Sequence, residues 1–386
     1  MAKDDWAIVV GIKSYFDPDL AGLQGPETDA TEFHRWVVAA DGGAVPAGQA
    51  TLIRSSDYHP PFTSEASAMP TADAIKVAFD HLRSMADENE GKGLGRVVGR
   101  RLYLFFAGHG FAPAHRDDLT ALLTAEASIA TARLSHVVGP YMADIFWRAK
   151  FFEETLLFMD CCREVMECTQ LYMPYEEERP TDFHKGRRFY AFGARVAKTS
   201  REWKMGDGEF HGVFTKTLLD ALRSTGYDHS DPSKITAESL RDQLYNGFKD
   251  FMSAADRTRP DIPNEPEVTY EQKPGANFTI VERANVVQRM LAPIPGVPRR
   301  VQRMLGLSQV PTFQVTIHVS EPRVGQKATI RDKDLELVSE ETLRESTVVQ
   351  LERGFYSIEI PGAAEPVVFE VTGAGEATGA GTEVHV

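Results

Sequence analysis

The chain has 386 residues, of which 42% are hydrophobic and 25% are charged, and its formal net charge is −14. These proportions are ordinary for a globular protein, and the length allows two domains. The negative charge disfavours non-specific binding to nucleic acid, and no apolar run of about 18 residues indicates a membrane span. The first residues lack the apolar core of a signal peptide, and three cysteines cannot form a paired framework. We therefore expect a cytoplasmic protein with reduced thiols.

The first part of the chain alternates predicted strands and helices. Trp6–Ile12 is a short apolar run typical of a buried strand, and a helix follows for which Thr28 or Asp29 would be the N-cap. Ala50–Arg54 is predicted as the second strand, and Thr71 is predicted to open the second helix. Such alternation favours a parallel sheet flanked by helices.

Two further apolar runs, Arg101–Gly110 and Thr155–Arg163, each end abruptly at reactive side chains. Short apolar runs bounded by turn signals are typical of buried strands in a parallel sheet. Chemistry in such sheets collects just beyond the carboxyl ends of the strands. His109 would lie at one strand end, and Asp160 and Cys162 at the other. A thiol and an imidazole at neighbouring strand ends are a candidate nucleophile and base.

The segments around these runs complete the αβ pattern. Between them, Leu122–Thr124 is predicted as a short edge strand and Tyr141–Phe152 as a helix. After them, Arg188–Ala194 is predicted as a strand and Gly212–Leu222 as a helix. The order of elements therefore continues strand after helix to the end of this part of the chain.

Two motifs carry a resemblance to a known family. Phe105–Gly110 resembles the histidine motif of the caspase-like and metacaspase-like cysteine peptidases, and Asp160–Cys162 resembles the Asp-x-Cys motif of the metacaspase branch. The separation of 162 − 109 = 53 residues fits the caspase spacing of about 50. The resemblance spans residues 5–281. It implies a bacterial-type cysteine endopeptidase with the caspase-like fold, an α/β structure with a mostly parallel sheet flanked by helices.

The resemblance also implies roles for the motif residues. Cys162, rather than its neighbour Cys161, would be the nucleophile, with His109 as base and then acid. The backbone N–H groups of Gly110 and Cys162 would be the oxyanion donors. The structural alternatives are a buried, inert thiol at 162 and a turn histidine at 109.

Asp160 is the candidate substrate-binding residue. In the metacaspase branch this aspartate holds Arg or Lys, so the resemblance implies cleavage after a basic residue through a charge-assisted pair. The alternative is that Asp160 only orients a nearby loop. A further acidic residue, Asp29 or one of Glu176–Glu178, is a candidate helper.

One departure from the family pattern is present, because Arg163–Val165 stands where metacaspase-like domains commonly have His-Ser-Gly. This departure supports the alternative function, a catalytically silent caspase-like scaffold that acts through partner binding.

As an enzyme, the chain resembles regulated effectors of bacterial stress and antiviral defence, which an activating partner or ligand switches on. The loop Tyr172–Lys185 is the segment that we expect to reorder. The expected substrate is a protein, with no role for nucleic acid or membrane.

No cofactor or metal site is predicted. The Gly11 that follows the first strand is not part of a Gly-rich nucleotide loop, and no compact acidic loop has calcium-ligand spacing. Several histidines lack ligand-type spacing and are predicted to be exposed or locally bonded: His34, His81, His115, His184 and His211.

The predicted domains are a peptidase domain at residues 1–283, a linker at 284–310 and a small β-sandwich with a Gly/Ala-rich tail at 311–386. In the linker, Val287–Leu291 recurs as Val301–Leu305. Two interpretations stay open for this repeat, two short amphipathic helices packed on the domain or an arm that docks a partner. The period-two alternation beyond the linker favours short strands of an antiparallel sandwich.

Overall fold

A computed structural model of the protein forms two compact units, the first ending at Ala284 and the second beginning at Asn285. It describes residues 4–282 and 312–385, apart from residues 21, 117, 132, 169, 177–185, 199, 201, 206–207, 229–230, 232, 253–264, 271–276, 320–322, 333–336, 353, 362–365 and 372–381. The predicted linker, its repeated segment and most of the Gly/Ala-rich tail lie outside these residues.

A six-stranded sheet forms the centre of the first unit, in the order β13-β9-β7-β3-β1-β2. All neighbours pair in parallel except β13, which runs antiparallel to β9 at the edge of the sheet. Its strands are β1 (Asp5–Gly11), β2 (Ala50–Arg54), β3 (Gly99–Gly108), β7 (Phe152–Cys161), β9 (Arg187–Phe192) and β13 (Glu267–Tyr270).

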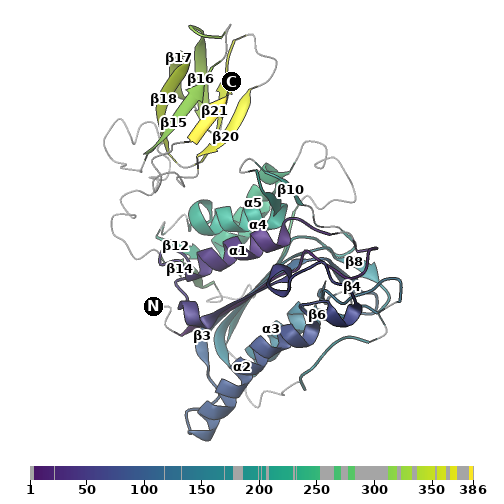
Figure 1. Ribbon diagram of the computed structural model, residues 1–386. Coiled ribbons are helices and arrows are strands. Elements are labelled where there is room, and N and C mark those ends of the chain that lie inside the picture. The colour runs from purple at the N-terminus through teal and green to yellow at the C-terminus, as the bar shows by residue number, and fades with distance from the viewer. Residues whose placement is uncertain are drawn as a thin grey trace. The chain divides into compact units, whose positions relative to one another are not determined.

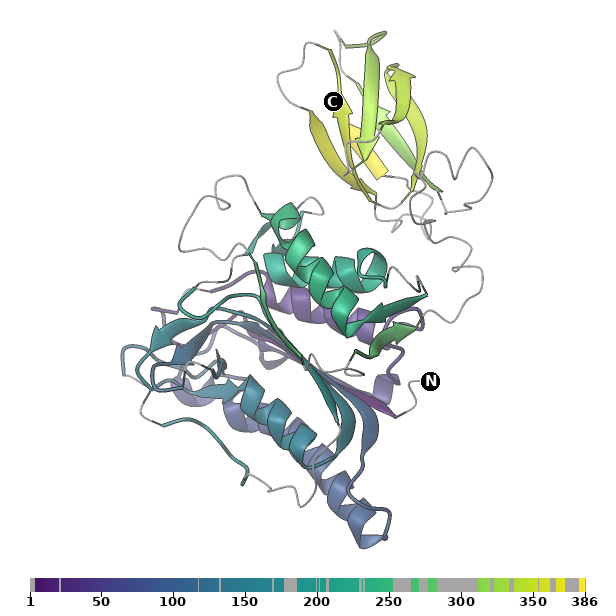
Figure 2. The same ribbon diagram turned by 180° about the vertical axis from the view of Figure 1, so that it is seen from behind.

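Helices cover both faces of this sheet (Figures 1 and 2). One face packs against α1 (Pro26–Val38), α4 (Val213–Asp220) and α5 (Ala237–Gly247). The other packs against α2 (Ala72–Gly91) and α3 (Gly139–Arg148). This arrangement confirms the predicted α/β class with a mostly parallel sheet flanked by helices.

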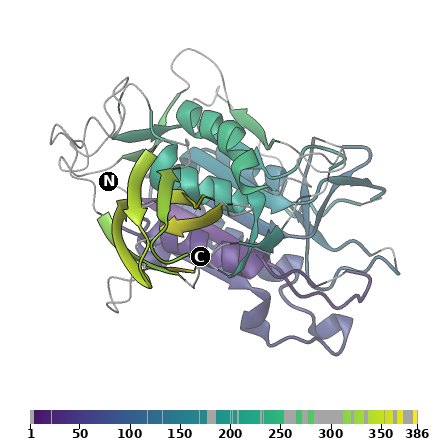
Figure 3. The ribbon, with the colours of Figure 1, turned by 90° about the horizontal axis from the view of Figure 1, so that it is seen from above.

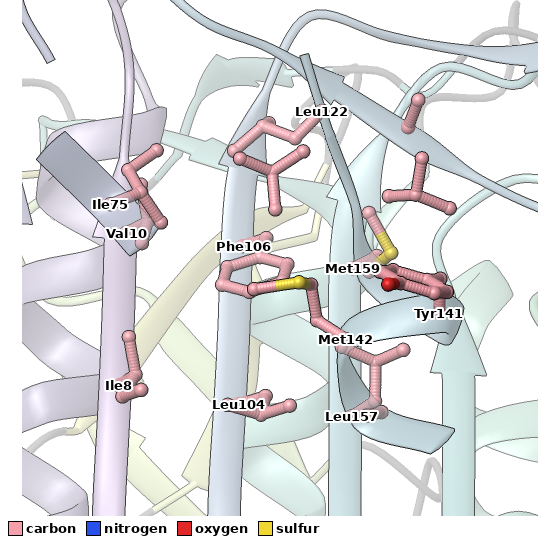
Figure 4. Packing of buried hydrophobic residues seen from close by; sticks show 14 of the residues in the cluster. Ile8, Val10, Ile75, Leu104, Phe106, Leu122, Tyr141, Met142, Leu157 and Met159 are labelled. Carbon is pink, nitrogen blue, oxygen red and sulfur yellow. The ribbon is translucent and has the colours of Figure 1, made fainter. Parts of the chain in front are cut away.

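Alternation along the strands divides the core between the two faces. Phe106 and Met159 belong to the cluster that packs on α2 and α3 (Figure 4), while Phe105 and Phe158 belong to the cluster on α1, α4 and α5. Successive side chains of a strand point to opposite faces, so a strand buried on both faces is apolar throughout. This is why β3 and β7 read as continuous apolar runs in the sequence.

Shorter elements extend the first unit beyond the central sheet. A small sheet in the order β6-β5-β4-β8 continues from the ends of β3 and β7, and two strand pairs, β10 with β11 and β12 with β14, complete the strands. The strands are β4 (Gly110–Pro113), β5 (Ala121–Leu123), β6 (His136–Val138), β8 (Glu164–Met166), β10 (Glu202–Lys204), β11 (Phe210–Gly212), β12 (Lys234–Thr236) and β14 (Thr279–Glu282). The short helical turns are η1 (Ala47–Gln49), η2 (Ser55–Tyr58), η3 (Glu65–Ser67), η4 (Ala221–Thr225) and η5 (Phe248–Phe251).

The second unit is a β-sandwich, as the alternation predicted, and Figure 3 shows its strands from above. Sheets β18-β15-β21 and β17-β16-β19-β20 share one apolar core, to which Ile317 and Ile330 belong. It is not wholly antiparallel, because β21 at the chain end runs parallel to β15. The strands are β15 (Thr312–His318), β16 (Lys327–Asp332), β17 (Leu337–Thr342), β18 (Ser346–Glu352), β19 (Gly354–Glu359), β20 (Val367–Val371) and β21 (Thr382–His385).

The predicted helix boundaries were partly right. Thr71 caps α2 by accepting a hydrogen bond from the backbone N–H of Ala74, as predicted. The predicted caps Thr28 and Asp29 are wrong, because α1 already begins at Pro26 and both residues lie inside it. The predicted helix Tyr141–Phe152 was too long, since α3 ends at Arg148.

The part of the chain that the structure describes contains no helix long and apolar enough to cross a membrane.

Candidate active site

The two predicted strand ends lie side by side. In the ladder between β3 and β7, Gly108 pairs with Cys161, an offset of 161 − 108 = 53 residues. Beyond the strand ends, β4 and β8 pair in parallel with Phe111 opposite Glu164, an offset of 164 − 111 = 53 residues. The register is therefore the same on both sides of His109 and Cys162. Since neighbouring strands lie roughly 4.8 Å apart, these two positions face each other directly across the strand ends.

The adjacent cysteines have different environments. Cys161 is 1% exposed and belongs to the apolar cluster on α2 and α3, and burial raises the pKa of its thiol well above the ordinary value. Cys162 comes directly after the end of β7 and is only partly buried, with its sulfur 3.9 Å from the carbonyl oxygen of Ser200. A buried thiol in apolar surroundings is inert, so of the two thiols only Cys162 has the partial exposure that a reactive cysteine needs.

The backbone at His109 is held on two sides. Its N–H donates to the hydroxyl of Tyr15 at 2.8 Å, and its carbonyl accepts a hydrogen bond from the N–H of Leu123 at 2.9 Å. Gly110 follows in β4, where an added Cβ would lie 2.7 Å from the sulfur of Cys161. A side chain at 110 would therefore force apart the two segments that carry His109 and Cys162. The N–H of Gly110 stays a predicted oxyanion donor.

Asp160 is buried beside Cys162 and ties together distant parts of the chain. One carboxylate oxygen accepts a hydrogen bond from the hydroxyl of Ser200 at 2.6 Å. The other accepts from the backbone N–H and the hydroxyl of Thr215 at 3.0 and 2.6 Å, in the first turn of α4. An added Cβ on Gly212 would lie 2.0 Å from this second oxygen, so the glycine leaves room for the carboxylate. Burial raises the pKa of Asp160, as does the nearby charge of Glu202.

Two more carboxylates surround Asp160. Asp29 in α1 lies 2.8 Å from Nδ1 of His211 and accepts the N–H of Gly212 at 2.8 Å. Burial and the charge of Asp160 raise the pKa of Asp29 to about 7, against the lowering effect of His211. The carboxylate of Glu202 accepts backbone N–H groups just before α1. Among the described residues, neither Asp160 nor Asp29 has a Lys or Arg partner.

The raised pKa of Asp29 leads to a prediction about stability. Because the folded-state pKa, about 7, lies above the ordinary value of 3.8, the favourable contribution of Asp29 is complete below pH 3.8 and is lost as the pH rises to about 7. Asn cannot titrate and can hydrogen-bond to both partners. The free energy of unfolding of Asp29→Asn, measured by urea unfolding, should therefore increase relative to that of the natural protein as the pH rises from 5 to 8. The expected increase is on the order of 2 kcal/mol.

The matched control is Asp57→Asn, in the half-exposed pair with Arg54. It should show no comparable gain, because a surface ion pair contributes at most about 1 kcal/mol. An Asp29→Asn difference that is equal at pH 5 and pH 8 would contradict the raised pKa.

Arg163, directly after Cys162, is buried and has several partners. Its side chain is 1% exposed, stacks over the ring of Phe192 at 4.6 Å and pairs with Glu267 of β13 at 2.7 Å. Its N–H donates to the carbonyl of Lys198 at 2.9 Å. The long buried arginine fixes this loop to the sheet edge.

The described start of the Tyr172–Lys185 loop is docked on the first unit; residues 177–185 lie outside the described part. The N–H of Tyr172 donates to Nε2 of His136 at 3.1 Å, and its hydroxyl donates to Asp73 of α2. The hydroxyl of Tyr175 donates to Asp80 of α2 at 2.9 Å. Tyr175 also exchanges backbone hydrogen bonds with the hydroxyl of Tyr141 in α3, so the segment is held against α2, α3 and β6.

Sequence reasoning thus placed His109, Gly110, Asp160 and Cys162 at one sheet edge, and the structure brings them there. Their catalytic and binding roles stay predictions. The prediction that His211 is exposed or locally bonded was wrong, because it is 1% exposed and bonds to a residue 182 positions away. The contributions of Tyr15, Ser200 and Thr215 were missed, since a hydroxyl side chain that bonds to a residue distant in sequence gives no periodic signal.

No group of three or more His, Cys, Asp or Glu side chains arranged to hold a metal ion occurs among the residues that the structure covers.

A scan against protein-family models finds no match. Among curated proteins, the chain is 29% identical over 233 residues to a protein from a Desulfuromonadales bacterium named as a probable protease. The match covers 58% of this chain and 26% of that protein, so the chain spans about a quarter of the relative's length.

Among solved structures, the chain is similar to the crystal structure of caspase-1 from Spodoptera frugiperda, with 13% identity, a TM-score of 0.41 and coverage of 69% of this chain and 88% of that chain. The structure of its pro-form matches with 12% identity, a TM-score of 0.39 and coverage of 69% and 87%. By name, the proteins to which this chain is similar are a probable protease and caspases.

Proposed function

We propose that the protein is a cysteine endopeptidase in which Cys162 is the nucleophile and His109 the general base. The observation that carries the proposal is the common register of 53 residues in the two strand pairs that flank these positions. It supports a thiol and an imidazole that emerge opposite each other from neighbouring strands.

The proposed reaction passes through a thioester between Cys162 and the substrate. His109 takes the proton of the Cys162 thiol, and the thiolate attacks the peptide carbonyl carbon. The backbone N–H groups of Gly110 and Cys162 stabilise the oxyanion that forms. The C–N bond breaks as His109 gives its proton to the leaving amine, which leaves a thioester. Water, deprotonated by His109, then hydrolyses the thioester to a carboxylic acid and restores the thiol.

The preferred residue before the cut is proposed to be Arg or Lys, with Asp160 as its partner. The support is electrostatic. Asp160 and Asp29 are buried acids without a Lys or Arg partner among the described residues, and Glu202 adds a third carboxyl group nearby. An incoming guanidinium would form charge-assisted hydrogen bonds with such carboxylates. This arrangement favours Asp29 over Glu176 as the helper residue.

The proposal extends to how the protein is regulated and to the cellular process in which it acts. We propose a cytoplasmic effector of bacterial stress or antiviral defence that an activating partner or ligand switches on. The docking of Tyr172 and Tyr175 on α2 supports a closed state of the loop that would have to reorder.

The test is labelling with two peptide electrophiles that differ only in the last residue, Arg or Asp. We expect the Arg probe to modify Cys162, located by mass spectrometry of the digested protein, and the Asp probe to react far more slowly. The alternative is a silent scaffold that acts through partner binding, favoured by the buried Arg163 after the thiol. Absence of labelling by either probe, with candidate activators present, would support the scaffold.

A further inference from the structure

Tyr15 lies in the loop that follows β1 and reaches the residue proposed as general base. Its hydroxyl accepts the backbone N–H of His109 at 2.8 Å and lies 3.2 Å from the carbonyl oxygen of Ile12, to which it donates. The hydroxyl therefore uses its donor and an acceptor site at once. The main chain at His109 is fixed by this contact to the end of β1.

The same side chain contacts the imidazole. The ring centroids of Tyr15 and His109 are 5.0 Å apart, with an interplanar angle of 51°. This separation lies within the range of roughly 4.5 to 7 Å in which aromatic rings attract each other. One residue thus holds both the backbone of His109 and its ring.

The residue before His109 is adapted to this contact. Gly108 has a φ of +152°, and an added Cβ would lie 2.8 Å from the hydroxyl oxygen of Tyr15 and 2.9 Å from the carbonyl oxygen of Ile12. A side chain at 108 would therefore collide with both partners of the hydrogen-bonded chain. The glycine of the histidine motif makes room for the tyrosine hydroxyl.

We infer that Tyr15 is a positioning residue for His109, which holds the imidazole in line with the Cys162 thiol. The inference rests on the proposed function and deepens it. A nucleophile's base is commonly oriented by a third group, and here a phenol hydroxyl and ring would share that task. Burial raises the pKa of Tyr15, so the hydroxyl keeps its proton at neutral and mildly alkaline pH.

The experiment measures the rate of Cys162 alkylation by iodoacetamide from pH 5 to 9, by mass spectrometry, which needs no peptide substrate. A thiol paired with His109 reacts at a pH well below the free-thiol pKa of about 8.5. Relative to the natural protein, we expect the alkylation rate at pH 6 to fall roughly threefold in Tyr15→Phe and roughly 10-fold in Tyr15→Leu. The rate in Tyr15→Leu should thus approach that of His109→Ala. In peptide cleavage, kcat should fall similarly and KM should change by less than about twofold.

The matched control is Tyr190→Phe, which removes a buried hydroxyl bonded to Asp144 at 2.7 Å; Tyr190 pairs with Leu157 of β7, five residues before Cys162. It should lower the thermal midpoint without changing the pH profile of alkylation. Tyr15→Phe retains the ring and guards against a folding defect, which the thermal midpoint of each variant reports.

Two outcomes would overturn the inference in different ways. If Tyr15→Leu reacts like the natural protein while His109→Ala is slow, Tyr15 does not position the imidazole and the proposed pair stands. If His109→Ala reacts as fast as the natural protein, there is no thiol–imidazole pair to position, and the proposed function falls as well.

Discussion

Replacing Cys162 by alanine is expected to abolish peptide cleavage, with kcat/KM at least about 10⁴-fold lower, because no other described group is placed to form the thioester. His109→Ala should lower kcat by about 10² to 10⁴, the usual contribution of a positioned general base. Both would be measured with an Arg-containing fluorogenic peptide under the conditions in which the Arg probe labels the protein.

The neighbouring cysteine provides a sharp control. Cys161→Ala removes a buried thiol from the core and should cost about 1 kcal/mol of stability, yet it should retain cleavage activity. The contrast depends on where β7 ends, since Cys161 is its last residue and packs toward α2 and α3, while Cys162 follows it and is only partly buried. Loss of activity in Cys161→Ala with retention in Cys162→Ala would show that the nucleophile is misassigned.

The sheet edge could be predicted from sequence because local patterns encode it. Strands buried on both faces require continuous apolar runs, and β3 and β7 are two such runs that stop at reactive residues. Parallel pairing then brings their carboxyl ends to one edge. The two motifs can therefore be assigned to one sheet edge without knowing how the loops run.

The surroundings of Asp160 could not be predicted because their partners are distant in sequence. Ser200 lies 40 residues away and Thr215 lies 55 residues away, and both bonds depend on how loops return to the sheet edge. The sequence predicts Asp29 as a candidate helix cap, since Asp near a helix start is typical of one. Its bond to His211 spans 182 residues, which no local pattern reports.

Removing the charge of Asp160 should change the preferred substrate of the protein. Asp160→Asn has the same shape, and its amide can still accept from Thr215 and donate to Ser200, so the fold should be retained. Loss of one partner of a buried charge pair costs about 2 to 5 kcal/mol. We therefore expect kcat/KM for peptides cut after Arg to fall by at least roughly 30-fold, with little change for a neutral residue. Library profiling measures both.

The control keeps the charge and removes a hydrogen bond, because Ser200→Ala takes away one hydroxyl from the same carboxylate. It should preserve the preference for Arg. The preference of the natural protein should also strengthen from pH 6 to pH 8, since burial raises the pKa of Asp29 to about 7 and the acid attracts a guanidinium only when ionised. An Asp160→Asn variant that is folded, active and still selective for Arg would place the basic-residue pocket elsewhere, because the charge thought to define it would then be dispensable.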